Sequence, residues 1–206
     1  MNKPNFILDF DNVLFYTWFA HLSYLNEIYG INTVLEDYLD SPPLTSLVNK
    51  YLPGRNITSP EFYVLFEEDF SKSLERHKDV FPLKGMPEVL SEIKKKYKLW
   101  VVTARTENSL HIMKYLIDKY IPNCLEEIYF VRKYIGNGNY ERSPKINLIE
   151  KIPEKKVAFI DDCLREVTAT KDILPSYLFD QHNFYRDVDK GVKVVKNWEE
   201  IGNLFL

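Results

Sequence analysis

The chain has 206 residues and a formal net charge of −3 at neutral pH, with acidic and basic side chains interspersed. This length fits one domain, or one domain that carries a modest insertion. Hydrophobic residues make up 45% of the chain and aromatic residues 15%, which favours a well-buried core and argues against disorder. Because no long basic run occurs, general binding to nucleic acids or to anionic membranes is disfavoured.

The cysteines and the N-terminal segment narrow the class of protein further. Cys124 and Cys163 do not have the spacing of a metal site, so we expect two reduced thiols. No cationic stretch followed by a long apolar run opens the chain, because Asp9 interrupts the first apolar segment. We therefore expect a cytoplasmic protein with no membrane partner.

A short apolar segment that runs into two aspartates organises the predicted fold. Residues 6–10 lack the alternation of a half-exposed strand and predict a buried parallel strand. Asp9 and Asp11 then lie at its C-terminal end, where ligands bind in open α/β sheets, and they face the same way if Asp9 keeps strand geometry. Two such carboxylates require either a hard cation such as Mg²⁺ or a division into acid and base.

Helical patterns follow this strand. Apolar spacing predicts a helix over residues 15–29 that ends at Gly30. Ser41-Pro42-Pro43 predicts a turn, and a short helix is expected over residues 44–51 before the break at Pro53-Gly54.

Another helix is expected after this break. Ser59 is its predicted cap and Pro60 its first residue, and the helix is expected to run to about His77. Residues 16–85 therefore form a predicted all-helical insertion.

Strands and helices alternate after Pro82, which implies a mostly parallel sheet with helices on both faces. The predicted strands are residues 99–102, 127–131, 157–160, 177–179 and 192–195. The predicted helices are residues 87–97, 107–120, 164–172 and 198–206, together with one that Ser143-Pro144 opens. Residues 136–139 predict a loop or a hairpin tip.

Polar residues gather at the predicted strand ends. Thr103 and the pair Asp161-Asp162 join the first two aspartates there, and Lys145 lies in the first turn of a helix. Taken singly, Thr103 is an ordinary helix cap and Lys145 an ordinary solvated lysine. Because parallel strands end at one edge of a sheet, the joint placement instead predicts a shared site.

These residues resemble the motifs of the haloacid-dehalogenase-like (HAD) superfamily of phosphohydrolases. The resemblance covers residues 1–15 and 86–206 and rests on Ile7–Leu14, Trp100–Thr103, Lys145 and Phe159–Asp162. It implies a Rossmann-like α/β core over these residues, with residues 16–85 as a small all-helical cap inserted after the first strand. Lys133 is a weaker match for the lysine motif, since it follows a strand directly and opens no helix. Position 12 is Asn where many relatives carry Gly.

The resemblance also implies a mechanism. Asp9 would attack phosphorus and form an aspartyl-phosphate, while Asp11 would protonate the leaving oxygen and then activate water. Mg²⁺ would be held by the Asp9 carboxylate, the Asp11 backbone carbonyl and Asp162, with Asp161 orienting the ligand shell. Lys145 would neutralise the phosphoryl oxygens and keep Asp9 ionised.

Less specific motifs imply which residues contact the phosphate and the rest of the substrate. Thr103 would bind the phosphate through its hydroxyl and nearby backbone N–H groups, with Asn12 and Ala104 beside it. The match of Thr103-Ala104-Arg105 and Ile160-Asp161-Asp162 to the 5'(3')-deoxyribonucleotidase-like branch suggests a nucleoside monophosphate. Arg105 would lie near the phosphate or the cap.

Aromatic residues of the cap offer a second clue to the substrate. Tyr16, Trp18, Phe19, Tyr24 and Phe62 could stack on a ring of the substrate or pack the cap's own core. We expect Trp18 and Phe19 to be among the residues that contact substrate.

Several functions stay open at this stage. The favoured one is a Mg²⁺-dependent phosphatase whose partner is a small soluble phosphate ester. A phosphatase acting on nucleic-acid ends or on a phosphoprotein would need a basic track, which the mild acidity disfavours, and a non-catalytic binding module would have lost motif residues. A dehalogenase is disfavoured because carbon chemistry does not use Asp11. The oligomeric state does not follow from the sequence.

Overall fold

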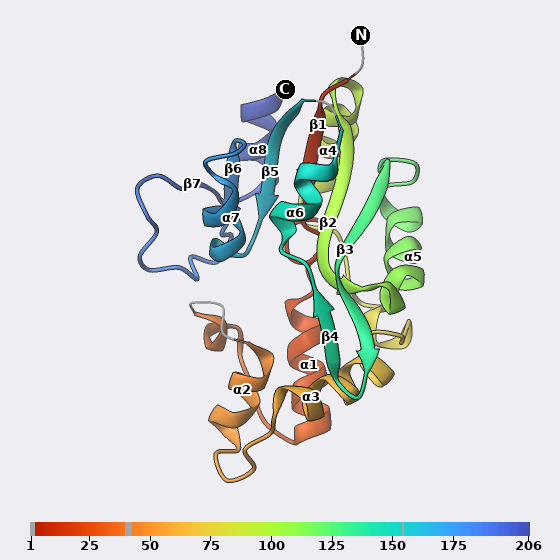
Figure 1. Ribbon diagram of the computed structural model, residues 1–206, viewed down its shortest axis with the longest axis vertical. Helices are drawn as coiled ribbons and strands as arrows, with labels where there is room; N and C mark the ends of the chain where they lie inside the picture. Colours follow the sequence, from red (N-terminus) through yellow and green to blue (C-terminus); the bar gives the residue numbers. More distant parts are fainter. Residues whose placement is uncertain (1–2, 40–42, 154) are drawn as a thin grey trace.

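The computed structural model describes residues 3–39, 43–153 and 155–206 (Figure 1). In these residues a seven-stranded sheet runs through the molecule in the order β4-β3-β2-β1-β5-β6-β7. Neighbouring strands are parallel except β4, which is antiparallel to β3. The strands are β1 Asn5–Leu8, β2 Lys98–Thr106, β3 Glu127–Gly136, β4 Asn139–Arg142, β5 Lys156–Asp161, β6 Ser176–Phe179 and β7 Lys193–Val195.

Helices cover both faces of the sheet, as the alternating pattern predicted. The helices are α1 Trp18–Tyr29, α2 Leu44–Tyr51, α3 Ser59–Leu65, α4 Met86–Lys96, α5 Leu110–Tyr120, α6 Lys145–Lys151, α7 Leu164–Thr170 and α8 Trp198–Phe205. Phe6 and Leu8 of β1 belong to the core cluster that includes residues of α4, α5 and α8, whereas Ile7 belongs to the cluster that includes residues of α6. Because side chains alternate along a strand, β1 is apolar on both faces.

The segment between β1 and α4 is helical in its described residues. It holds α1, α2 and α3, a π-helical turn at Phe66–Phe70, and two 3-10 turns at Leu35–Tyr38 and Glu75–His77. Figure 1 shows this segment at one end of the sheet, next to the β3–β4 hairpin. Its two connections to the core pair with each other, since the Tyr16 N–H donates to the Phe81 carbonyl at 2.9 Å and Leu83 to Leu14 at 3.0 Å. The domain boundaries at residues 16 and 85 stay a prediction.

Two predicted helices differ in their bounds. The helix expected from residue 15 begins at Trp18, because Phe15 forms a β-bridge with Pro82 and accepts a hydrogen bond from Asn12. It ends at Gly30 as predicted, with a left-handed φ of 63°.

The helix expected over residues 59–77 is not continuous. Helix α3 ends at Leu65, and the π-helical turn and a later 3-10 turn replace the rest. Its cap is Thr58 rather than Ser59, because the Thr58 side chain and Glu61 hydrogen-bond each other's backbone N–H groups. The turn predicted at Ser41-Pro42 lies outside the described residues.

The strands also differ in length from the prediction. Strand β1 ends at Leu8 rather than Phe10, although the Asp9 N–H still donates to the Ile160 carbonyl at 2.9 Å. Strands β2 and β3 are longer than predicted. Residues 136–139 form the tip of a hairpin, whose second strand, β4, was not predicted.

Cys124 and Cys163 are both free, as expected. In the described part of the chain, no helix has the length and apolar character needed to cross a bilayer.

Candidate active site

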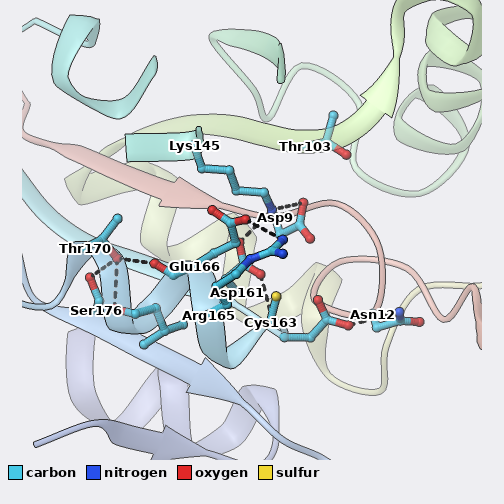
Figure 2. Close-up of polar contacts among 12 residues, drawn as sticks. Asp9, Asn12, Thr103, Lys145, Asp161, Cys163, Arg165, Glu166, Thr170 and Ser176 are labelled. Atoms are coloured by element: carbon cyan, nitrogen blue, oxygen red, sulfur yellow. Dashed lines mark hydrogen bonds and ion pairs between the residues drawn. The ribbon is translucent and has the colours of Figure 1, made fainter. Parts of the chain in front are cut away.

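The predicted site residues come together where β1, β2 and β5 end. Asp9 follows β1 directly, Thr103 lies in β2, and Asp161 closes β5. Lys145 is the first residue of α6, and Figure 2 shows its side chain reaching toward Asp9 and Asp161. The parallel register of these strands therefore assembles residues that are more than 130 positions apart, as Asp9 and Lys145 are.

Lys145 forms a buried ion-pair network. Its Nζ lies 2.9 Å from Asp9 Oδ1 and 2.6 Å from Asp161 Oδ2, and its side chain is only 2% exposed. Although burial disfavours a charged lysine, Asp161 and Asp9 outweigh it and raise the pKa of Lys145 above its usual range. Lys145 therefore stays cationic. Lys133 is exposed on β3, outside this network.

Three carboxylates gather at this site, and two of them contact Lys145. One oxygen from each of Asp9, Asp161 and Asp162 lies within 4.8 Å of the others. Burial is the main cause that raises the pKa of Asp9 to about 7 and the pKa of Asp162 well above its usual range, and neighbouring aspartates add to both. Burial likewise raises the pKa of Asp161. A divalent cation would relieve this surplus of negative charge, and the oxygen donors suit a hard ion, so the residues fit Mg²⁺.

Asp161 and Asp162 have different partners. Asp161 Oδ2 accepts from Lys145 and its Oδ1 accepts from the Cys163 N–H at 2.9 Å. Asp162 Oδ2 accepts from the Asn12 amide at 3.1 Å. The Asp162 carbonyl also accepts from the Tyr185 hydroxyl at 2.9 Å, which fixes the loop after β5.

Asn12 links the first helix to this loop. Its backbone has a left-handed φ of 55°, which Asn tolerates better than most residues. Its Oδ1 accepts from the backbone N–H groups of Thr17 and Trp18 at the start of α1, and its own N–H donates to Phe15. The backbone N–H and the side-chain amide of Asn12 therefore both have protein partners, and Asn12 acts as a cap and a loop anchor. Phosphate binding by Asn12 stays a prediction.

Asp11 has a different cationic partner from Asp9. Arg105 Nε lies 2.9 Å from Asp11 Oδ2, and Arg105 Nη2 lies 2.8 Å from Oδ1. Burial acts against ionisation, but Arg105 outweighs it and holds the pKa of Asp11 well below its usual range. Asp9 and Asp11 therefore face different cations, because the strand ends before Asp9 and the alternation expected of residues i and i+2 does not continue.

The second motif contributes a buried hydroxyl. Thr103 is fully buried, and its Oγ1 accepts from the Arg105 N–H at 3.2 Å. Ala104 is half-buried against the core cluster on the α6 side of the sheet. Arg105 contacts the helical segment through His77, so it lies at the cap interface rather than in solvent.

The two aromatic residues expected to contact substrate differ from each other in exposure. Trp18 is buried, with its ring centroid 3.9 Å from that of Tyr38, whereas the Phe19 side chain is 58% exposed. A small pocket beside the aspartates brings Trp18 together with residues from the loop after β6. It is lined by Asn12, Tyr16, Trp18, Asp162, Phe179, Asp180, Gln181, His182, Phe184 and Tyr185.

Some residues at the site were not predicted from the sequence. Buried Glu166 of α7 accepts hydrogen bonds from Arg142 at 2.8 Å and from Arg165 at 3.0 Å (Figure 2). His182 and Tyr185 lie in the loop after β6, and the aromatic pair Phe184-Tyr185 is the one sequence signal that marks this loop.

No protein-family model and no curated protein matches the chain. Solved structures do. A protein assigned as a phosphatase from Clostridium difficile is 18% identical with a TM-score of 0.70, and each chain is covered over 100% of its length. A predicted phosphatase from Clostridium acetobutylicum is 16% identical with a TM-score of 0.69, covering 99% of this chain and 98% of that chain.

A third similar structure is assigned to the HAD hydrolases. It comes from Bacillus subtilis, was solved bound to magnesium, and is 13% identical with a TM-score of 0.62, covering 100% of this chain and 99% of that one. At these identities the likeness concerns the fold. The sheet order, the helical segment after β1 and these similar structures together show that the chain has the fold of the haloacid-dehalogenase-like superfamily.

Proposed function

We propose that this chain is a Mg²⁺-dependent phosphomonoester hydrolase that acts through an aspartyl-phosphate on Asp9. The observation that carries this proposal is the cluster of Asp9, Asp161 and Asp162 at the ends of β1 and β5, in which buried Asp9 and Asp161 both contact Lys145. A nucleophilic carboxylate beside a fixed cation is what phosphoryl transfer requires, because catalysis there consists mainly of positioning and charge stabilisation.

Each residue has a defined task in this reaction. Asp9 attacks phosphorus. Asp11 leaves its ion pair with Arg105 to give a proton to the leaving oxygen and then takes one from the water that hydrolyses the aspartyl-phosphate, because within that pair its carboxylate is held ionised. Lys145 stabilises charge on the phosphoryl oxygens, and Thr103 binds the phosphate. Mg²⁺ held by the Asp9 carboxylate, the Asp11 backbone carbonyl and Asp162 would polarise the phosphoryl group. The magnesium in the similar structure from Bacillus subtilis supports this choice of ion.

The substrate we propose is a small soluble phosphate ester, with nucleoside monophosphates first. The small pocket beside Asn12 and Asp162 carries aromatic rings from two segments, among them Tyr16 and Phe184, and it would have to widen to admit a base. Aromatic rings suit a planar leaving group such as a base. The deoxyribonucleotidase-like motif around Thr103 supports the same substrate class.

Phosphate release tests the proposal. The wild-type protein should release phosphate from p-nitrophenyl phosphate and from members of a nucleotide panel when Mg²⁺ is present, and release should stop with a chelator. Asp9→Asn should abolish release while keeping the fold, because an amide cannot form the acyl-phosphate. Undiminished release by Asp9→Asn would refute the assignment of Asp9 as the nucleophile.

A further inference from the structure

The pocket beside Asp162 is closed by two side chains from distant parts of the chain. The Tyr16 hydroxyl lies 3.1 Å from His182 Nε2, and the centroids of the two rings are 5.6 Å apart. Both residues line the pocket, and the space left inside it has room for about one water molecule. A nucleobase or another planar ring is much larger, so a ring enters only if Tyr16 and His182 part.

His182 lies on the tip of a tight turn in the loop after β6. Buried Asp180 holds the base of this turn, because its Oδ1 accepts from the Phe184 N–H at 2.7 Å. Gln181 and Asn183 on the tip are exposed, and His182 between them is half-buried. The His182 ring can therefore turn outward into solvent while Asp180 and Phe184 stay in place.

Tyr16 is the fixed side of the pair. Its side chain is buried, its ring packs against Phe81 and Phe19, and its N–H donates to the Phe81 carbonyl at 2.9 Å. Burial raises the pKa of Tyr16 and lowers the pKa of His182, so both groups are neutral near pH 7. A hydrogen bond between neutral groups is weak enough for a bound ring to replace.

We propose that Tyr16 and His182 form a gate on a ring-binding subsite beside Asp162, and that this gate selects the substrate by its leaving group. This inference rests on the proposed function. A small leaving group does not need the subsite, whereas a planar ring must part the pair before it stacks against Tyr16 and Phe184. The affinity for a ring is therefore reduced by the fraction of molecules in which the gate is closed.

Nucleoside binding tests the gate without any need for catalysis. Trp18 lines the pocket, whereas Trp100 and Trp198 are buried elsewhere, so tryptophan fluorescence excited outside the absorption of the nucleoside reports a ring in the subsite. Tyr16→Phe keeps the stacking ring and removes the bond that closes the gate. It should lower the Kd of thymidine by about two- to tenfold. KM for thymidine monophosphate should fall by the same factor relative to KM for ethyl phosphate.

Further variants complete the design. His182→Phe breaks the same bond from the half-buried side and should tighten thymidine to a similar extent, so it also serves if Tyr16→Phe does not fold. The double variant should bind no tighter than either single one, because both changes remove one bond. Tyr51→Phe is the matched control, since its hydroxyl donates to Asp37 at 2.6 Å in the same helical segment and Tyr51 does not line the pocket. It should leave the Kd of thymidine unchanged.

The results that overturn the inference are distinct from those that overturn the proposed function. Weaker binding in Tyr16→Phe would show that the hydroxyl contacts the ring rather than excluding it, and unchanged binding would show that the pair is no barrier. Either result, or no binding of thymidine by the wild-type protein and both single variants, refutes the gate. Failure of the wild-type protein to release phosphate refutes the proposed function, whereas the thymidine affinities do not depend on that release.

Discussion

A buried carboxylate, that of Glu67, joins the helical segment to the β3–β4 hairpin. Removing one of its hydrogen-bond donors gives a quantitative prediction for the free energy of unfolding. Glu67 is 3% exposed, and its Oε1 accepts from the Tyr140 hydroxyl at 2.9 Å while Oε2 accepts from Thr106 at 2.8 Å and Asn108 at 3.3 Å. Tyr140→Phe removes one of these donors and adds no volume. A hydrogen bond to a charged group contributes about 1.5–3 kcal/mol, so we expect the free energy of unfolding to fall by about 2 kcal/mol.

Urea unfolding followed by circular dichroism measures this loss. In a chain of this size it corresponds to a fall in Tm of about 4–8 °C. Tyr134→Phe is the matched control on the same hairpin, because the Tyr134 hydroxyl accepts a single bond from the neutral Gly138 N–H at 3.2 Å, worth about 1 kcal/mol. Equal losses in the two variants, or a loss under about 0.5 kcal/mol in Tyr140→Phe, would refute the view that Glu67 depends on this donor.

Three more predictions follow from geometry and charge. Gly138→Ala should destabilise the protein more than Gly136→Ala in the same urea assay. Both glycines have positive φ, but a Cβ at 138 would lie 1.9 Å from a backbone oxygen of α3, whereas a Cβ at 136 would meet open space. Equal losses of stability would contradict the close contact. His21 is half-buried, and desolvation lowers its pKa to about 4. Between pH 6.5 and 4 the unfolded state therefore binds the proton first, and the wild-type protein should lose stability relative to His21→Phe by up to about 1.4 kcal/mol per pH unit as the pH falls. A pH-independent difference would refute a lowered pKa for His21. Saturating Mg²⁺, at about 100 times its dissociation constant, should stabilise the wild-type protein by about 2.7 kcal/mol in thermal unfolding, and Asp162→Asn should lose most of that gain. An equal gain in Asp162→Asn would show that Asp162 is not a ligand.

The sequence predicted which polar residues lie at the ends of the strands better than it predicted the side-chain partners of those residues. Buried strands have a strong apolar signal, so β1 and β5 and the residues at their ends could be located, and Lys145 follows from the Ser-Pro helix start. The division of Asp9 and Asp11 between Lys145 and Arg105 could not be predicted, because it depends on where β1 ends and on the position of β2.

The helical segment shows the same limit. Helix α2 and the end of α1 match their apolar spacing and Gly30. The break after Leu65 has no Gly or Pro to mark it, and it arises where Glu67 turns toward Thr106 and Tyr140 of the core. Tertiary hydrogen bonds of this kind leave no local pattern in a sequence.

The position of Asn12 would link the proposed metal site thermodynamically to the helical segment. One amide binds the start of α1 through its oxygen and Asp162 through its nitrogen, so a rotation of α1 and a change at Asp162 alter the same side chain. Linkage is reciprocal: if a cation at Asp162 favours one orientation of α1, a substrate that favours that orientation must tighten the cation by the same factor. Cation affinity measured with and without a substrate analogue would then report the position of the cap.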